Sequence, residues 1–390
     1  MKFYEQCGST LRVEIHDAER RATLLKGHFM LDRRSFLSLT SLALLGGLPV
    51  VAQEPKAVGD APKRSKDRAG IELITPPTKT ALQRALAFLA KRQNSQGQHR
   101  GAFGTQGYAG GVAVCGLGGL AFLASGSAPG RGLYGKHIER CVEYLSANTD
   151  AKGFISAVAL GSMDNMYGHG FATLFLAEAY GMSMHADVDE KLGKKVRAAV
   201  NLIVATQSDA GGWRYQPQKS DADLSITICQ IMALRAARDA GVDVPTATRD
   251  KCIDYVKKSQ APNGSFCYTL GNGHGSFALT AAGVVALNSA GIYDSPEVEK
   301  GLKFISASKP NGTMNDGYFF YSQYYAAQAM WHAGGDYWSG WYTAIRDTLL
   351  KTQKANGAWQ DPGVGEEFGT AMACIILQLP YNYVPVFGES

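Results

Sequence analysis

Carboxylates and one histidine are the side chains of this 390-residue sequence whose types and spacing could do acid–base chemistry. The sharpest motif is Asp221-Ala222-Asp223-Leu224-Ser225, which lies directly before an apolar segment. A second carboxylate pair, Glu366 and Glu367, precedes another apolar segment. A carboxylate in that position can act as a general acid, or it can cap a helix by accepting backbone N–H bonds. Capping would lower the pKa of Asp223 and make it a poor proton donor.

His169 lies between two glycines in the apolar stretch Tyr167-Gly168-His169-Gly170. Each glycine inside a helix costs about 1 kcal/mol relative to alanine, so the arrangement needs a reason. One reason is close helix packing with the imidazole bonded to a neighbouring carbonyl, and the other is a catalytic or ligand-binding role. His274, within the glycine-rich segment 271–276, is expected on a loop, where it is either a lid residue or part of a turn.

A turn that recurs six times indicates which elements position these residues. A helical pattern ends, often in glutamine, and a turn rich in Asn, Asp and Gly with an apolar or aromatic residue follows. The recurrence at roughly fifty residues is typical of a repeat architecture, in which one supersecondary unit is stacked. The six turns are 93–103, 150–154, 207–213, 260–266, 309–314 and 353–359.

Each turn separates two helical patterns of different character. The first helix is amphipathic; in 137–148, for example, Ile138, Cys141, Val142 and Leu145 follow the spacing i, i+3, i+4, i+7. The second is small and apolar on nearly all sides, which predicts burial. The amphipathic helices are expected at 80–93, 137–148, 189–207, 249–260, 296–308 and 340–353. The apolar helices are expected at 108–125, 167–180, 223–240, 277–290, 319–333 and 366–379.

This alternation predicts an all-α fold, an α/α toroid of six helical hairpins with charged helices outside and apolar helices inside. Strand patterns are sparse. An open superhelix is the alternative, but such arrays usually present a polar concave face, which the apolar helices lack.

In a toroid all inner helices begin at one rim, where six helix N-termini supply free N–H groups and partial positive charge. Asp223 in the third repeat would face Glu366 and Glu367 in the sixth across this rim. The fifth inner helix is rich in aromatic residues, and its Tyr321 and Tyr324 are expected to reach the cavity and form a wall for an apolar ligand. The polar residues expected at the rim are Tyr108, Tyr167, His169, Asp221, Asp223, Ser225, Thr227, His274, Ser276, Tyr318, Tyr321, Glu366 and Glu367.

The turns and six hairpins resemble the prenyltransferase and squalene oxidase repeat family over about residues 75–385. That family includes squalene–hopene cyclases, protein prenyltransferase β subunits and complement-type thioester domains. In the cyclase motif Asp-x-Asp-Asp, Asp223 takes the place of the proton-donating middle Asp, but Leu224 replaces the next one, and the second helical barrel of a cyclase is missing. In the zinc motif Asp-x-Cys of prenyltransferases, Ser225 stands at the Cys position and is a poor zinc ligand. The thioester motif Gly-Cys-Gly-Glu-Gln is absent.

The resemblance therefore implies the fold and an apolar, isoprenoid-like ligand, with Asp223, Asp221 and His169 as the catalytic candidates if the protein is an enzyme. No metal or cofactor is expected. A non-catalytic binding or scaffold toroid with a protein partner is the second hypothesis. A carbohydrate-active enzyme, with Asp223 and Glu366 or Glu367 as an acid/base pair, is the third.

The N-terminal segment predicts export. Arg33-Arg34-Ser35-Phe36-Leu37 resembles a twin-arginine motif, and an apolar core (37–48) and a small-residue cleavage site at Val50-Val51-Ala52 follow it. The signal would begin at Met30, which is expected to be the true start, with residues 1–29 a mis-assigned start. The expected organisation is a leader (1–52), a linker (53–74) and the toroid (75–390). An uncleaved signal would anchor the toroid to the outer face of the membrane.

The distribution of charge and the cysteine pattern argue against two further classes of protein, nucleic-acid-binding proteins and disulfide-stabilised folds. Most of the net charge of +5 falls in the first 70 residues, so the toroid has no basic face of the size that nucleic acid requires. The seven cysteines include no C-x-x-C pair, and no disulfide framework is indicated.

Overall fold

The computed structural model describes residues 70–104, 108, 110–157, 165–183, 186–308 and 318–388 of the 390-residue chain. These residues belong to one compact unit, Ala61–Ser390. The twin-arginine motif, most of the expected linker and the fifth turn (309–314) lie outside the described residues. Among the helices that are described, none combines the length and the apolar character needed to cross a membrane.

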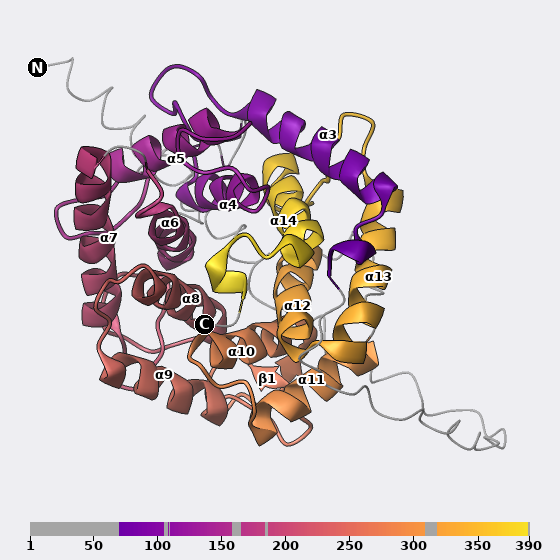
Figure 1. Cartoon of the computed structure of the whole chain (residues 1–390). Helices are drawn as coiled ribbons and strands as arrows, with labels where there is room; N and C mark the ends of the chain where they lie inside the picture. Colours follow the sequence, from indigo (N-terminus) through magenta and orange to yellow (C-terminus); the bar gives the residue numbers. More distant parts are fainter. Residues whose placement is uncertain are drawn as a thin grey trace, which may run out of the picture. The chain divides into compact units, whose positions relative to one another are not determined.

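Twelve α-helices lie in the described residues, and they alternate between an outer and an inner ring (Figure 1). The outer helices are amphipathic, and the second of them buries the four apolar residues whose spacing predicted it. The six outer helices are α3 (Pro76–Arg92), α5 (Gly135–Ala147), α7 (Ala186–Thr206), α9 (Thr246–Lys258), α11 (Pro296–Ser308) and α13 (Gly335–Thr352).

The inner helices are buried almost all round, and every residue of the first two is buried. Each packs against the next in chain order, and the last packs against the first, so the ring closes. The α/α toroid is thereby confirmed and the open superhelix is wrong. The six inner helices are α4 (Val112–Leu123), α6 (Met166–Ala179), α8 (Leu224–Asp239), α10 (Phe277–Ser289), α12 (Phe319–Ala333) and α14 (Glu366–Gln378).

The recurring glutamine ties its own turn to the next outer helix. Gln93 donates from Nε2 to its own turn at Gly101 O and to His137 O at the start of α5, both at 2.9 Å. Gln353 makes the same pair of bonds to Gly357 O and Ala81 O, also at 2.9 Å, and so joins the last turn to the first outer helix. Gln207 and Gln260 repeat this arrangement.

The turn glycine is required because the turn touches the backbone of the next outer helix. Gly211 has φ +103°, and a Cβ built on it would lie 2.1 Å from Lys251 O of α9. Any other residue would be strained and would collide with that carbonyl.

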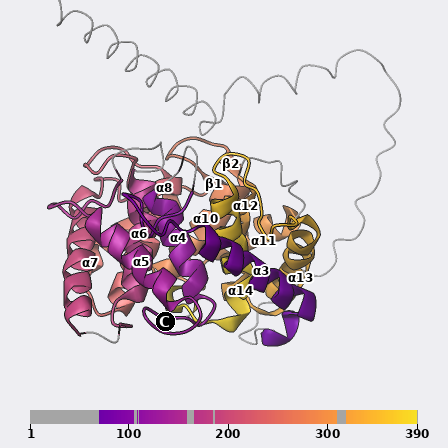
Figure 2. The same cartoon turned by 90° about the horizontal axis from the view of Figure 1, so that it is seen from above.

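The two rims of the toroid differ (Figure 2). The inner helices begin at one rim, called here the turn rim, beside the short strands β1 (Phe266–Cys267) and β2 (Gly275–Ser276). The C-terminal segment, with the short 3-10 helices η2 (Leu379–Tyr381) and η3 (Pro385–Phe387), lies at the opposite tail rim.

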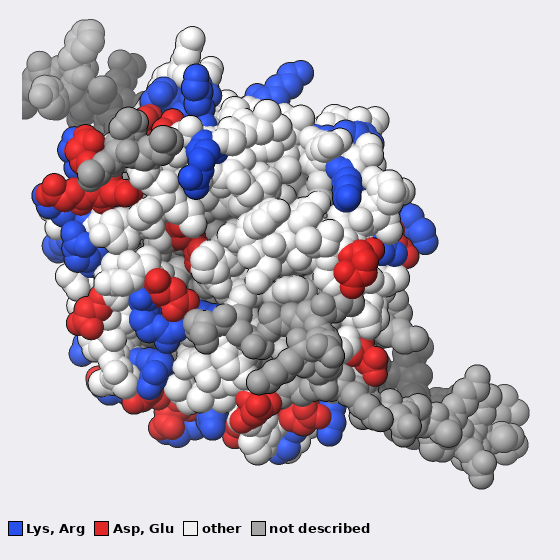
Figure 3. Space-filling view, viewed as in Figure 1, with Lys and Arg blue, Asp and Glu red and all other residues white. Residues whose placement is uncertain are grey.

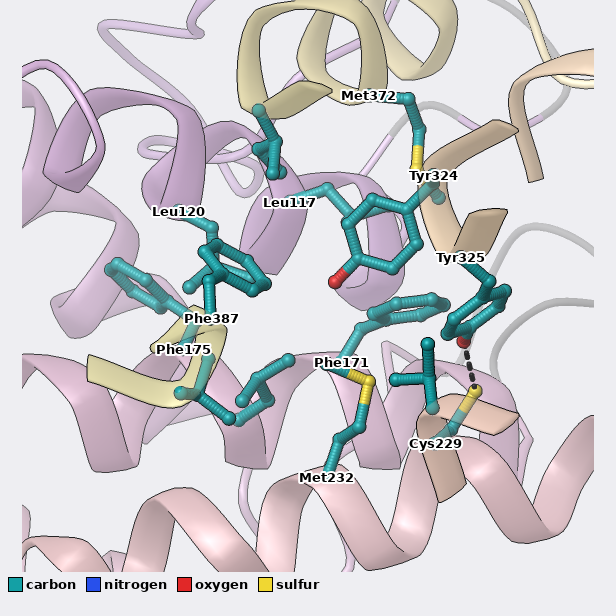
Figure 4. Close-up of a cluster of buried hydrophobic side chains, with 14 of the residues drawn as sticks. Leu117, Leu120, Phe171, Phe175, Cys229, Met232, Tyr324, Tyr325, Met372 and Phe387 are labelled. Carbon is teal, nitrogen blue, oxygen red and sulfur yellow. Dashed lines mark hydrogen bonds between the residues drawn. The ribbon is translucent and has the colours of Figure 1, made fainter. Parts of the chain in front are cut away.

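Apolar side chains from the inner helices fill the axis of the ring (Figure 4). Tyr324 of α12 points inward, and its ring meets that of Phe387 edge-on at 6.2 Å between centroids. The C-terminal segment thus contributes to the core, with Val384, Val386 and Phe387 buried in it. The labelled core residues of Figure 4 are Leu117, Leu120, Phe171, Phe175, Cys229, Met232, Tyr324, Tyr325, Met372 and Phe387.

Candidate functional site

Asp223 is fully buried and caps α8. Its Oδ1 accepts the backbone N–H of Ile226 at 2.9 Å and the hydroxyl of Ser225 at 2.6 Å. The aspartate therefore satisfies an N–H group at the helix start, where the helix dipole favours negative charge. The Ser225 hydroxyl is committed to the same carboxylate.

The second carboxylate oxygen faces a tyrosine and an arginine. Tyr268 donates its hydroxyl to Asp223 Oδ2 at 3.2 Å, and Arg214 Nε lies 3.5 Å from the same oxygen. The Tyr215 hydroxyl lies 2.6 Å from that of Tyr268, so a chain of hydroxyls ends on Asp223. The guanidinium group of Arg214 stacks on both tyrosine rings, and Nη1 also binds Asp221 at 2.6 Å.

Backbone hydrogen bonds hold these groups together across three repeats. The N–H of Asp223 donates to Trp213 O at 3.0 Å, and the N–H of Leu224 donates to Tyr268 O at 2.9 Å. The N–H of Met166, the first residue of α6, donates to Tyr215 O at 3.0 Å. The starts of α6 and α8 and the strand before α10 are thus fixed relative to one another.

Two further tyrosines complete the group. Tyr167 packs on Tyr215 with 6.1 Å between ring centroids. Burial raises the pKa of Tyr321, and electrostatic interactions with Cys229, Asp223 and Tyr215 raise it further. We call Tyr167, Arg214, Tyr215, Asp223, Tyr268 and Tyr321 the rim cluster.

The pKa of Asp223 corrects one expectation. Capping predicted a lowered pKa, but burial raises it, because desolvation of the carboxylate outweighs the donors Ser225, Ile226, Arg214 and Tyr268. The carboxylate is therefore held by hydrogen bonds in an environment that penalises its charge. Such a combination is found at functional sites and in structural networks alike.

The hydroxyl of Tyr321 is buried and has no hydrogen-bond partner among the described residues. Its ring meets that of Tyr325 edge-on at 4.8 Å, and the Tyr325 hydroxyl lies 3.5 Å from Cys229 Sγ. A buried hydroxyl without a partner is uncommon in native proteins and marks a place where a water or a ligand atom fits. Tyr324, which also lacks a hydroxyl partner among these residues, lies deeper, in the core at the axis.

His169 stands at a position of the inner helix whose side chain accepts a backbone N–H from the preceding turn, and the same bond occurs in other repeats. Its Nδ1 accepts the backbone N–H of Ile155 at 3.2 Å. In three other repeats a threonine hydroxyl on the inner helix accepts the equivalent N–H: Thr227 from Trp213, Thr280 from Phe266 and Thr370 from Trp359.

The surroundings of His169 agree with that role. Burial lowers the pKa of His169 to about 4, so the ring is neutral, and Ala199 and Asp150 only partly offset this. A Cβ on Gly170 would lie 2.7 Å from Cys229 Cβ of α8, so the glycine permits close packing of the two helices. The packing explanation therefore accounts for this histidine, whose Nδ1 is bonded to a backbone N–H group.

The other sequence-predicted residues are not brought into the rim cluster. Glu366 pairs with Lys354 at 2.9 Å, which lowers its pKa, and Glu367 pairs with Arg92 at 2.6 Å. They lie at the start of α14, on the side of the inner ring opposite α8. His274 is exposed in the loop between β1 and β2.

Sequence reasoning missed Arg214, Tyr215 and Tyr268. A signal was present, because Tyr215 and Tyr268 each stand two positions after the turn aromatic, Trp213 or Phe266, of consecutive repeats. Equal offsets in a repeat place side chains at equal heights on one rim. In the described part of the chain no cluster of three or more His, Cys, Asp and Glu could hold a metal, and its six cysteines are buried and free.

Comparison with known proteins supports the fold. Residues 171–318 match the family model described as the prenyltransferase alpha-alpha toroid domain, which confirms the resemblance inferred from the turns. No curated protein matches the chain by sequence.

Solved structures of several kinds share the architecture. Cellobiose 2-epimerase from Bacillus thermoamylovorans B4167 is 12% identical with a TM-score of 0.56, covering 78% of this chain and 98% of its own. An α-1,6-mannanase variant from Salegentibacter sp. HEL1_6 is 10% identical with a TM-score of 0.57, covering 77% and 97%. A type II terpene cyclase from Scytonema is 15% identical with a TM-score of 0.49, covering 80% and 98%. At these identities the likeness to the epimerase and the mannanase shows the fold alone.

Proposed function

We propose that this protein is an exported, non-catalytic toroid that binds an apolar small molecule carrying a hydroxyl group, such as an isoprenoid alcohol. The hydroxyl binds at the rim cluster, and the apolar part lies on the aromatic side chains beside it. Asp223 holds the binding wall in place and does not donate a proton.

The observation that carries this proposal is the free hydroxyl of Tyr321 next to a saturated hydrogen-bond network. Asp223 already accepts from Ile226, Ser225 and Tyr268 and pairs with Arg214. The Tyr321 hydroxyl, in contrast, has no partner within the described residues. A ligand oxygen that accepts from it would remove the cost of that buried polar group.

Binding fits the cluster better than proton transfer. Tyr268 donates its hydrogen to Asp223, so the carboxylate acts as an acceptor in this network. His169 is neutral, and its Nδ1 is used by the turn. The two glutamates expected to face Asp223 are paired with Lys354 and Arg92.

An apolar ligand is supported by the aromatic character of the wall. Tyr215, Tyr268 and Tyr321 are half-buried, so part of each ring surface is available at the rim. Aromatic faces bury large apolar areas, and tyrosine adds a polar end that fixes orientation. Because side chains fill the axis, we place the ligand at the rim and not through the centre of the ring.

The export part of the proposal rests on the sequence of residues 30–52, with Arg33-Arg34 ahead of a short apolar core. Twin-arginine export would deliver the toroid already folded. N-terminal sequencing of protein from the cell envelope tests this part: a new N-terminus close to Gln53 supports cleavage at Ala52, and recovery only in the cytoplasm contradicts export.

Tyr321→Phe tests the binding site. The substitution removes only the unpartnered hydroxyl, so we expect the ligand-free protein to be at least as stable as the wild type. Binding of a polyprenol should be about fivefold weaker, from the loss of about 1 kcal/mol for one hydrogen bond. Binding of squalene, which has no hydroxyl, should be weaker than that of the polyprenol and insensitive to the substitution.

Tyr342→Phe is the matched control. Its hydroxyl, on α13, donates to Leu377 O at 2.8 Å. Removing it should lower the free energy of unfolding by about 1 kcal/mol and leave polyprenol affinity unchanged. Equal polyprenol affinities for the wild type and Tyr321→Phe would contradict the assignment of the hydroxyl site.

A further inference from the structure

A pocket lies at the tail rim, away from the rim cluster. Its volume is about 400 Å³, within the range of small-molecule sites. It lies between the C-terminal ends of α4 and α6, the loop that follows α4 and the C-terminal segment. The polar groups that line it are Ser125, Ser127, Arg131, Glu178 and Tyr383.

The base of the pocket holds a carboxyl group that is almost completely buried. Glu178, in the last turn of α6, is 5% exposed, and its Oε1 accepts the N–H of Val386 at 3.1 Å. Burial raises its pKa to about 8, so at neutral pH it is a protonated acid that can donate as well as accept. The hydroxyls of Ser125 and Ser127, 3.3 Å apart, line the wall beside it.

The charges around the pocket disfavour ions of either sign. The C-terminal ends of α4 and α6 carry partial negative charge, which opposes an anion. The exposed cation Arg131 at the mouth opposes a positively charged ligand. Where no grey atoms cover this face of the molecule, the charged residues lie mainly toward the edge and the surface nearer the middle is mostly uncharged (Figure 3).

One wall of the pocket is aromatic. Tyr383 is 55% exposed and stacks on Tyr381 with 5.5 Å between ring centroids and 10° between planes. The C-terminal segment that carries it is anchored by Val386 on Glu178 and by a hydrogen bond of 2.5 Å from Arg235 to Gly388 O. The ring of Tyr383 is therefore a fixed platform, and not part of a free tail.

We propose that this pocket binds a neutral, hydroxyl-rich small molecule, a monosaccharide or similar polyol. The ring face of the sugar would stack on Tyr383, while its hydroxyls would exchange hydrogen bonds with Ser125, Ser127, Arg131 and Glu178. These groups supply both donors and acceptors, as a polyol requires. The site is separate from the rim cluster and does not depend on the function proposed there.

The experiment is a saturation-transfer NMR titration of residues 53–390 with the methyl glycosides of glucose, mannose and galactose. We expect at least one to bind. Glucosamine and glucuronic acid, which carry a positive and a negative charge, should bind more weakly than the neutral glycoside. Absence of binding by all three neutral glycosides, or tighter binding of a charged analogue, would overturn the proposal.

Tyr383→Ala should weaken the binding by about tenfold, and Tyr383→Phe, which retains the stacking face, should restore it. Leu133→Ala is the control, because Leu133 is 83% exposed on the same loop as Arg131 and does not line the pocket. Equal affinities of the wild type and Tyr383→Ala would place the sugar elsewhere and would also overturn the proposal. Tyr383 is exposed, so the folded state of each variant is readily checked by its melting temperature.

Discussion

Glu178→Gln should stabilise the protein, and by an amount that depends on pH. The side chain is almost completely buried at the end of α6, and its pKa is about 8 compared with 4.5 in an unfolded chain. Between these two values the folded state binds a proton that the unfolded state has released. The free energy of unfolding therefore falls as the pH rises through this window.

The size of the effect follows from the shift. Each pKa unit corresponds to about 1.4 kcal/mol, so Glu178 costs about 3 kcal/mol of stability at pH 7, about 4 kcal/mol at pH 8 and about 5 kcal/mol well above pH 8. Below pH 4.5 the carboxyl is protonated in both the folded and the unfolded state, so this loss of stability is absent there. Glutamine has the same shape, stays neutral at every pH, and can still accept the N–H of Val386. The charges that act on Glu178 are Asp239, which raises its pKa, and Arg235, which lowers it.

Urea denaturation of wild type and Glu178→Gln at pH 5, 7 and 8 measures this difference. The variant should be only slightly more stable at pH 5, and its advantage should grow by about 1.4 kcal/mol per pH unit up to pH 8. A constant difference across this range, or a less stable variant at pH 8, would refute the reasoning, because it would mean that Glu178 titrates normally in the folded protein.

Two other substitutions test the hydrogen bonds that set the fold and the rim cluster. Gln353→Ala should lower the free energy of unfolding by about 2 to 3 kcal/mol, because two bonds are lost where the last turn meets the first outer helix. Glutamate at the same position should not restore it, since a carboxylate cannot donate. Asp223→Ala should cost about 3 to 5 kcal/mol, because it removes the cap of α8 and leaves Arg214 and Tyr268 without their acceptor. Asp223→Asn retains an acceptor for the cap and should cost less; equal losses in the two variants would contradict the capping role.

The fold could be predicted from the sequence because each repeat contains the local patterns that predict its structure. The glutamine, the glycine of the turn and the alternation of half-exposed and buried helices are local patterns, and the structure explains the first two by contacts with the next outer helix. The second repeat shows how a departure is tolerated. Thr149 stands where four other repeats have glutamine: its hydroxyl bonds only to Leu145 O of α5, while Lys195 of α7 donates to the Thr149 carbonyl at 3.1 Å.

The candidate site was harder to predict, since its chemistry depends on pairs of residues far apart in the chain. Asp223 was identified, but Tyr268 is 45 positions away and reaches it only because consecutive repeats stack. The pKa of Asp223 was expected to be low because capping is a local effect, whereas burial depends on the packed ring. In the second repeat the turn residue equivalent to Trp213 is Ile155 and not the aromatic Phe154, and only the bond to His169 shows this.

The most direct test of the proposed function is to purify the exported protein from a native-like host and identify any bound molecule by native mass spectrometry followed by solvent extraction. The proposal predicts one apolar molecule with a hydroxyl group per chain, recovered at reduced occupancy from Tyr321→Phe and at wild-type occupancy from Tyr342→Phe. An empty wild-type protein that also fails to take up polyprenols or squalene would contradict it and would favour a scaffold that binds through its outer surface.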